Sequence, residues 1–168
     1  AGLGSAYDLL ETQTLGTATS SVTFSSLGDY SSGYQHLQLR YIARNTSSQT
    51  GVYTDINGSA LGNARYLLGD GSNVSTAGAS NPSQIGLTAG SGAATGDFRG
   101  GVLDLLDPFS TTKYKTIRSL SSSQSAIILF MGLWESTSSV TSWKMENVNG
   151  DFVAGSRFSL YGIKAGAE

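Results

Sequence analysis

The chain of 168 residues contains no cysteine, two prolines and a single histidine. Without cysteine it can form neither disulfides nor thiolate metal sites, and one histidine cannot make a two-histidine zinc site. A serine triad would have to use His36, which lies on the polar face of a regular alternating stretch, and no GxSxG elbow occurs. We therefore expect no catalytic residue, no bound metal and no cofactor.

Charge is also scarce, since charged residues make up 13% of the chain, about half of the usual share. The net charge is −2, and the ten lysines and arginines are scattered, so the sequence offers no stripe that could follow a phosphate backbone. The longest apolar run, "AIILFMGLW" at 126–134, is too short to span a membrane. These absences argue against a nucleic-acid partner and against membrane insertion.

Small polar residues take the place of charge, because the chain has 27 serines, 16 threonines and 22 glycines. Its surface must rely on hydroxyls and backbone groups for solubility. Few charges would have to be desolvated when two such surfaces meet. This composition favours contacts between subunits.

The most regular stretch is "YQHLQLRYIAR" at 34–44. Apolar residues alternate there with polar ones, which predicts a strand with one buried face and one exposed face. The buried face would consist of Leu37, Leu39, Tyr41 and Ala43. The opposite face would present His36, Gln38, Arg40, Ile42 and Arg44.

Short β-prone segments follow one another along the whole chain, and no segment predicts a helix with confidence. The expected strands are 8–15, 21–26, 34–44, 51–57, 64–70, 98–107, 114–122, 126–134, 139–147 and 157–164. Asn57-Gly58 suits a tight turn, because both residues tolerate positive φ. About ten short strands of this kind predict an all-β fold, an antiparallel β-sandwich of the jelly-roll type.

The chain is expected to form one domain over 1–168, with 1–6 as an N-terminal arm. The segment 69–96 is rich in glycine and serine and predicts a long loop region, with a short strand around Ile85 and Leu87. At 64–70 a helical turn competes with a strand. The run at 126–134 predicts a central strand, buried on both faces or against a neighbouring subunit.

Carboxylate pairs and calcium loops were weighed as sources of chemistry. Asp104 and Asp107 fall on opposite faces of a regular strand, which weakens a glycosidase-type pair, and Glu135 follows a strand end. The loop that begins at Asp55 lacks the third ligand and the glycine of an EF-hand, and turn formation explains Asp70 equally well. Capping and turn roles are the commoner explanation for all of these residues.

Aromatic residues offer a different possibility. Tyrosine and tryptophan rings combine an apolar face with a polar edge, so they can stack against a sugar. We expect Tyr53, Tyr66 and Trp134 to supply such a glycan contact if one exists. Packing in the core or between subunits is the more common role of such rings, and the sequence favours it.

Several phrases of the chain, taken in order, resemble a family of small β domains in tailed bacteriophages. The phrases are "SSVTFSSL", "YQHLQLRYIAR", "GVLDLLDPFSTTKYKTIRSLSS", "GLWESTSSVTSWKM" and "GDFVAGSRFSLYGIK". Together they cover nearly the whole chain. They are structural rather than catalytic motifs, so no catalytic residue is carried over.

The resemblance implies a jelly-roll-like domain displayed on the virion surface, typically as a homotrimer. A chain that is nearly all domain favours a capsid decoration or cement protein, whereas an excised fragment would favour a tail-fibre head. We expect a non-enzymatic structural protein whose partners are its own copies and other phage capsid or tail proteins. Gln38, Arg40 and Arg44 are the expected contact residues. The alternative is a receptor-binding module at a fibre tip that recognises host-surface polysaccharide.

Overall fold

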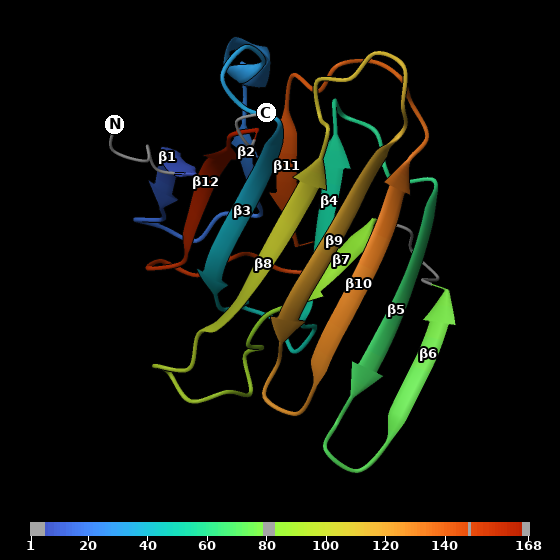
Figure 1. Cartoon of the computed structure of the whole chain (residues 1–168). Helices are drawn as coiled ribbons and strands as arrows, with labels where there is room; N and C mark the ends of the chain where they lie inside the picture. The colour runs from blue at the N-terminus through green and yellow to red at the C-terminus, as the bar shows by residue number, and fades with distance from the viewer. Residues whose placement is uncertain (1–5, 79–82, 148, 166–168) are drawn as a thin grey trace.

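The computed structural model describes residues 6–78, 83–147 and 149–165, and this part of the chain is built from β-strands (Figure 1). Its only helical element is the short 3₁₀ helix η1, Leu27–Tyr30. The strands are β1 Tyr7–Thr14, β2 Ser21–Phe24, β3 His36–Ala43, β4 Gly51–Ile56, β5 Asn63–Gly69, β6 Val74–Gly78, β7 Gln84–Leu87, β8 Arg99–Leu106, β9 Lys115–Ser122, β10 Ile127–Trp134, β11 Trp143–Glu146 and β12 Arg157–Ile163.

The strands form two antiparallel sheets that pack face to face. The large sheet has eight strands in the order β1-β12-β3-β8-β9-β10-β5-β6, and the small sheet has four in the order β2-β11-β4-β7. Figure 1 shows the large sheet in front of the small one. The prediction of an all-β antiparallel sandwich is confirmed, with twelve strands instead of about ten.

The pairing of strands follows the jelly-roll order. β1 pairs with β12, β2 with β11, β3 with β8, and β4 with β7, so partners from opposite ends of the chain form nested pairs. Successive nested pairs alternate between the two sheets, which is the arrangement of a rolled ribbon of strands. The hairpins β5–β6 and β9–β10 are inserted into this order, and both extend the large sheet beyond β8.

The core lies between the inner faces of the two sheets. Its largest buried side chains come from both layers: Trp143, Phe24, Phe130, Phe152 and Phe158. The predicted buried face of β3 is confirmed, because Leu37, Leu39, Tyr41 and Ala43 are at most 4% exposed. The polar edge of the largest core side chain is satisfied, since Trp143 Nε1 donates to Thr54 Oγ1 at 2.8 Å.

Three local predictions are settled by the structure. Asn57 and Gly58 adopt φ angles of 50° and 75°, as a tight turn requires. The stretch 64–70 belongs to a strand, β5, and has no helical turn. The expected long loop at 69–96 contains β6 as well as β7, whereas 79–82 lie outside the described residues. β6 was missed because small residues fill "VSTAG" and leave no apolar alternation.

The prediction that β10 is buried on both faces is wrong for the single chain. Ile128 and Phe130 are almost fully buried, whereas Ile127, Leu129 and Met131 are between 48% and 61% exposed. The strand is a regular alternating one whose outward positions also carry apolar residues.

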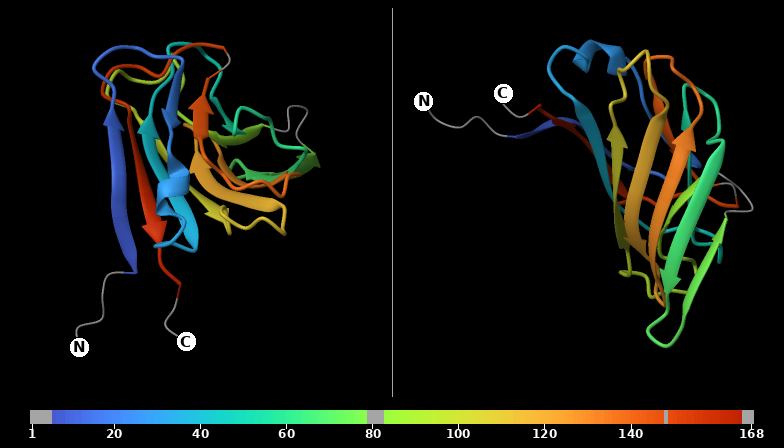
Figure 2. Two further views of the ribbon diagram at one scale, coloured as in Figure 1. Left: turned by 90° about the horizontal axis from the view of Figure 1, so that it is seen from above. Right: turned by 45° about the vertical axis from the view of Figure 1, so that its right-hand side comes forward.

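The two ends of the described chain lie side by side at one end of the sandwich (Figure 2). The Lys164 amide donates to the Ala6 carbonyl at 3.1 Å, next to the last pair of the β1–β12 ladder. Asp8 accepts from Lys164 Nζ at 2.7 Å and from the Tyr34 hydroxyl at 2.9 Å. Hydrogen bonding to Lys164, and then to Tyr34, lowers the pKa of the Asp8 carboxyl. Residues 1–5 of the expected arm lie outside the described residues.

No helix in the described ranges is long and apolar enough to cross a membrane.

One cation is enclosed in the fold. Lys115, at the start of β9, is fully buried, and its ammonium donates to the carbonyls of Ser110, Lys113 and Ser136 at 2.6 to 3.3 Å. The ammonium also lies 5.7 Å from the centre of the Trp134 ring. Burial lowers the pKa of Lys115. This side chain joins the loop before β9 to the loop after β10.

We expect Lys115→Met to destabilise the fold by about 2 kcal/mol, because the three carbonyls lose their shared donor. Urea denaturation would measure this loss. Lys113→Met is the matched control: its ammonium is mostly exposed and pairs with Asp107 at 3.0 Å, so its removal should change stability by less than about 0.5 kcal/mol. Equal effects of the two substitutions would contradict the anchoring role of Lys115.

Candidate functional site

The outer face of the large sheet, which points away from the small sheet, is the most unusual surface of the molecule. Strand register places outward side chains in rows that run across the strands. One row, the leucine row, consists of Val102, Leu120, Leu129 and Leu67, which are direct partners on β8, β9, β10 and β5. Neighbouring strands lie about 4.8 Å apart, so these four side chains form a continuous apolar line.

The inserted hairpins make one half of this face apolar. The apolar half is defined by six aliphatic residues that are between 44% and 72% exposed: Leu67, Val74, Leu120, Ile127, Leu129 and Met131. They expose on the order of 600 Å² together, the upper end of the largest patch on a typical monomer. A contiguous patch of this size marks an interaction surface more often than chance exposure.

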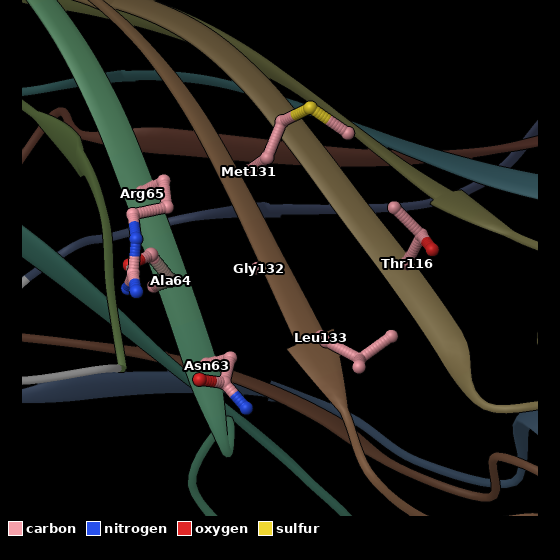
Figure 3. Close-up of a pocket in the computed structure, with 7 residues that line it drawn as sticks. All are labelled: Asn63, Ala64, Arg65, Thr116, Met131, Gly132 and Leu133. Carbon is pink, nitrogen blue, oxygen red and sulfur yellow. The ribbon is translucent and has the colours of Figure 1, made fainter. Parts of the chain in front are cut away.

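Two shallow depressions flank the leucine row. One, of about 450 Å³, is lined by Asn63, Ala64, Arg65, Thr116, Met131, Gly132 and Leu133 (Figure 3). The other, of about 290 Å³, is lined by Leu67, Gly69, Gly71, Val74, Ile127 and Leu129. Both are open and mostly apolar. They suit the side chains of a protein partner better than a small polar ligand.

The other half of the outer face, the polar half, carries a polar row among exposed apolar residues such as Leu9 and Ile42. Asp104 on β8 accepts from Gln38 Nε2 at 2.7 Å and from Arg118 Nε at 2.9 Å, so a polar row crosses β3, β8 and β9. Next to it, the Arg40 guanidinium lies 4.7 Å from the ring centre of Tyr161 and 5.8 Å from that of Tyr7. Arg40 is exposed, and its Nε donates to Gln38 Oε1 at 2.7 Å.

This face is cationic although the protein is acidic. Outward positions of the strands carry four arginines, Arg40, Arg65, Arg118 and Arg157, against one carboxylate, Asp104. Of these four arginines, only Arg118 has a carboxylate partner within 4 Å among the described residues. The chain as a whole has a net charge of −2. The remaining arginines are therefore available to acceptors on another molecule.

The structure separates the three expected contact residues. Arg40 lies exposed on the polar half of the outer face. Gln38 is 7% exposed and serves to connect Arg40 with Asp104. Arg44 lies just beyond β3, where its Nη2 donates to the carbonyls of Ser91 and Ala93 and thus holds the loop after β7. Of the three, Arg40 is the one whose guanidinium faces solvent for contact.

The possible glycan platform of Tyr53, Tyr66 and Trp134 is not formed. Trp134 is 5% exposed and belongs to the core, which corrects its assignment as a glycan contact. Tyr66 is half-buried and stacks on Phe130 with ring centres 5.9 Å apart. Tyr53 lies on β4 of the small sheet. The aromatic group that sequence reasoning missed is the exposed Tyr7 with the half-buried Tyr161, which register places on the outer face beside Arg40.

The candidate catalytic groups are used structurally. His36 Nδ1 accepts the Asp107 backbone N–H at 3.0 Å, so this nitrogen has no free lone pair to act as a base. A hydrogen bond from Lys113 lowers the pKa of the Asp107 carboxyl. Asp104 is held in the polar row, and Glu135 accepts from Asn63. No acid–base pair is assembled by these residues.

The two calcium candidates are explained in the same way. Asp55 forms an ion pair with Lys144 at 2.6 Å, and Asp70 Oδ1 accepts the backbone N–H groups of Ser72 and Asn73 in a turn. No cluster of three or more histidine, aspartate and glutamate side chains is found in the described part of the chain. Both aspartates therefore have structural partners.

Asp104→Ala should destabilise the protein by about 1–2 kcal/mol, because the nearly buried Gln38 amide and Arg118 both lose their acceptor. Thermal unfolding would report the change. Asp29→Ala removes an exposed carboxylate at η1 and should stay within about 0.5 kcal/mol of wild type. If Asp104→Ala also left the unfolding free energy unchanged, the polar row would not be a stabilising network.

No family model matches this chain, and a search of curated proteins finds no match. The comparisons therefore name no relative from which a role for the outer face could be transferred. Its chemistry is the basis for the function inferred below.

Proposed function

We propose that this protein is a non-enzymatic structural protein on the surface of a tailed-phage particle, either a capsid decoration or cement protein or a fibre head, and that it works as a homo-oligomer. The observation that carries the proposal is the exposed apolar half of the outer face, on a fold whose candidate catalytic groups all have structural partners. The phage setting is supported by the ordered motifs that resemble virion β domains, and that resemblance also implies a trimer.

The apolar half is large enough to supply most of the free energy of a stable contact. Removing about 600 Å² of apolar surface from water contributes about 15 kcal/mol before other terms. Association costs about 4–15 kcal/mol in lost freedom of motion, so the surplus is small and polar contacts must help. A protein that assembles on a particle, where many copies are held close together, can use a surface of this strength.

The polar half supplies the second kind of contact. Arg40 is exposed and its planar guanidinium is held between the rings of Tyr7 and Tyr161, so little side-chain freedom is lost when it binds a carboxylate. Arg157 also points outward. It lies on β12 two residues before Ser159, which is the direct partner of Arg40 on β3. These two cations suit an acidic surface of a neighbouring capsid or tail protein.

A tagged copy of the chain, supplied during infection by the phage that encodes it, should be incorporated into purified particles. We expect Arg40→Ala to lower the number of incorporated copies at least several-fold, because it removes the exposed cation of the polar half. Lys113→Ala, a mostly exposed lysine in the loop before β9, is the matched control and should incorporate normally. Quantitative mass spectrometry of the particles gives the readout. If the tagged wild-type chain is absent from purified particles, the proposed function is overturned.

A glycan-binding role is the second candidate, and the observation that favours it is the exposed Tyr7 and the half-buried Tyr161, whose rings both lie beside Arg40. Aromatic rings next to a guanidinium suit a sugar that carries a carboxylate or sulfate. We expect any binding on an array of acidic polysaccharides to fall at least tenfold in Tyr161→Ala and to persist in Tyr66→Ala. An array without binding, or equal loss in both variants, would contradict this role.

A further inference from the structure

We propose that the apolar half of the outer face binds the same surface of a second copy, so that two chains form an isologous dimer with Leu129 at its centre. The inference rests on the proposed function only in that both require contact between copies. It names the occupant of a surface that is otherwise exposed to water.

The area agrees with a dimer interface. Each copy would contribute about 600 Å² of apolar surface from six aliphatic side chains, and the pair would bury about 1,200 Å². That total reaches the lower bound of specific protein interfaces before any polar rim is counted. Arg65, Arg118 and Asn63 border the patch and would form that rim.

The chain offers no different apolar surface of similar size among its described residues. Outside the apolar half, the large hydrophobic residues that are exposed are Tyr7, Leu9, Ile42 and Tyr114. The first two lie on β1, Ile42 lies on β3, and Tyr114 lies in a loop. A ring of copies needs two unlike surfaces that complement each other, whereas a two-fold pair needs one surface that complements itself. The distribution of apolar residues therefore favours a two-fold pair over the trimer that the resemblance implies.

The shape of the surface also fits a self-complementary contact. The leucine row lies between two open depressions, one at Gly132 and the other at Gly69 and Gly71, and Val102, Leu120 and Leu129 line a third, smaller one. Met131 and Ile127 project on either side of Leu129 along β10. In a pair centred on Leu129, projecting side chains of one copy can enter the depressions of the other.

Charge distinguishes a second copy from an acidic partner on this surface. The rim of each copy carries a net positive charge, because Arg65 has no carboxylate within 4 Å in the described chain, whereas Arg118 is paired with Asp104. Two such rims repel each other weakly, so added salt should strengthen the dimer by screening this repulsion. An acidic partner on the same surface would instead be released by salt.

Sedimentation or light scattering over a concentration series provides the test. We expect wild-type protein to reach a mass of twice 17.4 kDa and to dimerise more tightly at higher salt. Leu129→Arg should weaken dimerisation at least tenfold. Leu9→Arg introduces the same side chain at an equally exposed position on β1 of the same face, outside the patch, and should leave the dimer intact.

A cross-link provides a second measure that does not depend on weakened association. The chain has no cysteine, so Leu129→Cys carries a single thiol, and a short bismaleimide should join two copies through it. Leu9→Cys should not be cross-linked under the same conditions and should run as a single chain on a denaturing gel.

A wild-type monomer at all concentrations, a trimer, or a dimer that persists in Leu129→Arg would overturn the inference. Incorporation of the chain into particles would then still stand as evidence for the proposed function, because that assay measures contact with other proteins.

Discussion

Face-to-face packing of the two sheets is the interaction on which the rest of the structure depends. Trp143 and Phe24 from the small sheet meet Phe130 and Phe158 from the large one in a shared core. Once these residues point inward, the two-residue period of each strand fixes every other side chain on the opposite face. The rows of the outer face, both polar and apolar, are therefore a geometric consequence of how the core is filled.

The abundance of hydroxyl groups also has a place in this packing. Ser119 and Ser121 on β9 are buried and bond to the backbone of β7, where Ser119 donates to the Ile85 carbonyl and Ser121 accepts the Leu87 N–H. The Tyr41 hydroxyl donates to the Leu87 carbonyl at 2.6 Å, and burial raises the pKa of this phenol. The short strand β7 is thus held to the large sheet by hydroxyls in addition to the apolar contacts of Ile85 and Leu87 in the core. Such bonds stabilise the structure because the backbone groups would otherwise be buried without partners.

Alternation in the sequence was enough to predict β3, most other strands and the jelly-roll class. It failed at β6, where small residues give no period. It would have placed Trp134 in the core, because this residue shares its parity with the buried Ile128 and Phe130 on β10. For the candidate site, alternation put Arg40 on the outer face, but it could not bring Tyr7 beside Arg40, because these strands are neighbours only through β12. Pairing between distant strands is the information that a single sequence does not contain.

The side-by-side ends of the described chain have a mechanical consequence. β1 and β12 are antiparallel, and Tyr7 is opposite Ile163 at the open end of their ladder. Tension applied between Ala6 and Lys164 would peel this ladder one hydrogen bond at a time, beginning at the ion pair of Asp8 with Lys164, because the load is not shared along the strands. A force that is applied at one chain end and resisted by contacts on a sheet face would instead load many hydrogen bonds at the same time. The direction of pull, more than the total stability, would decide whether the sandwich opens.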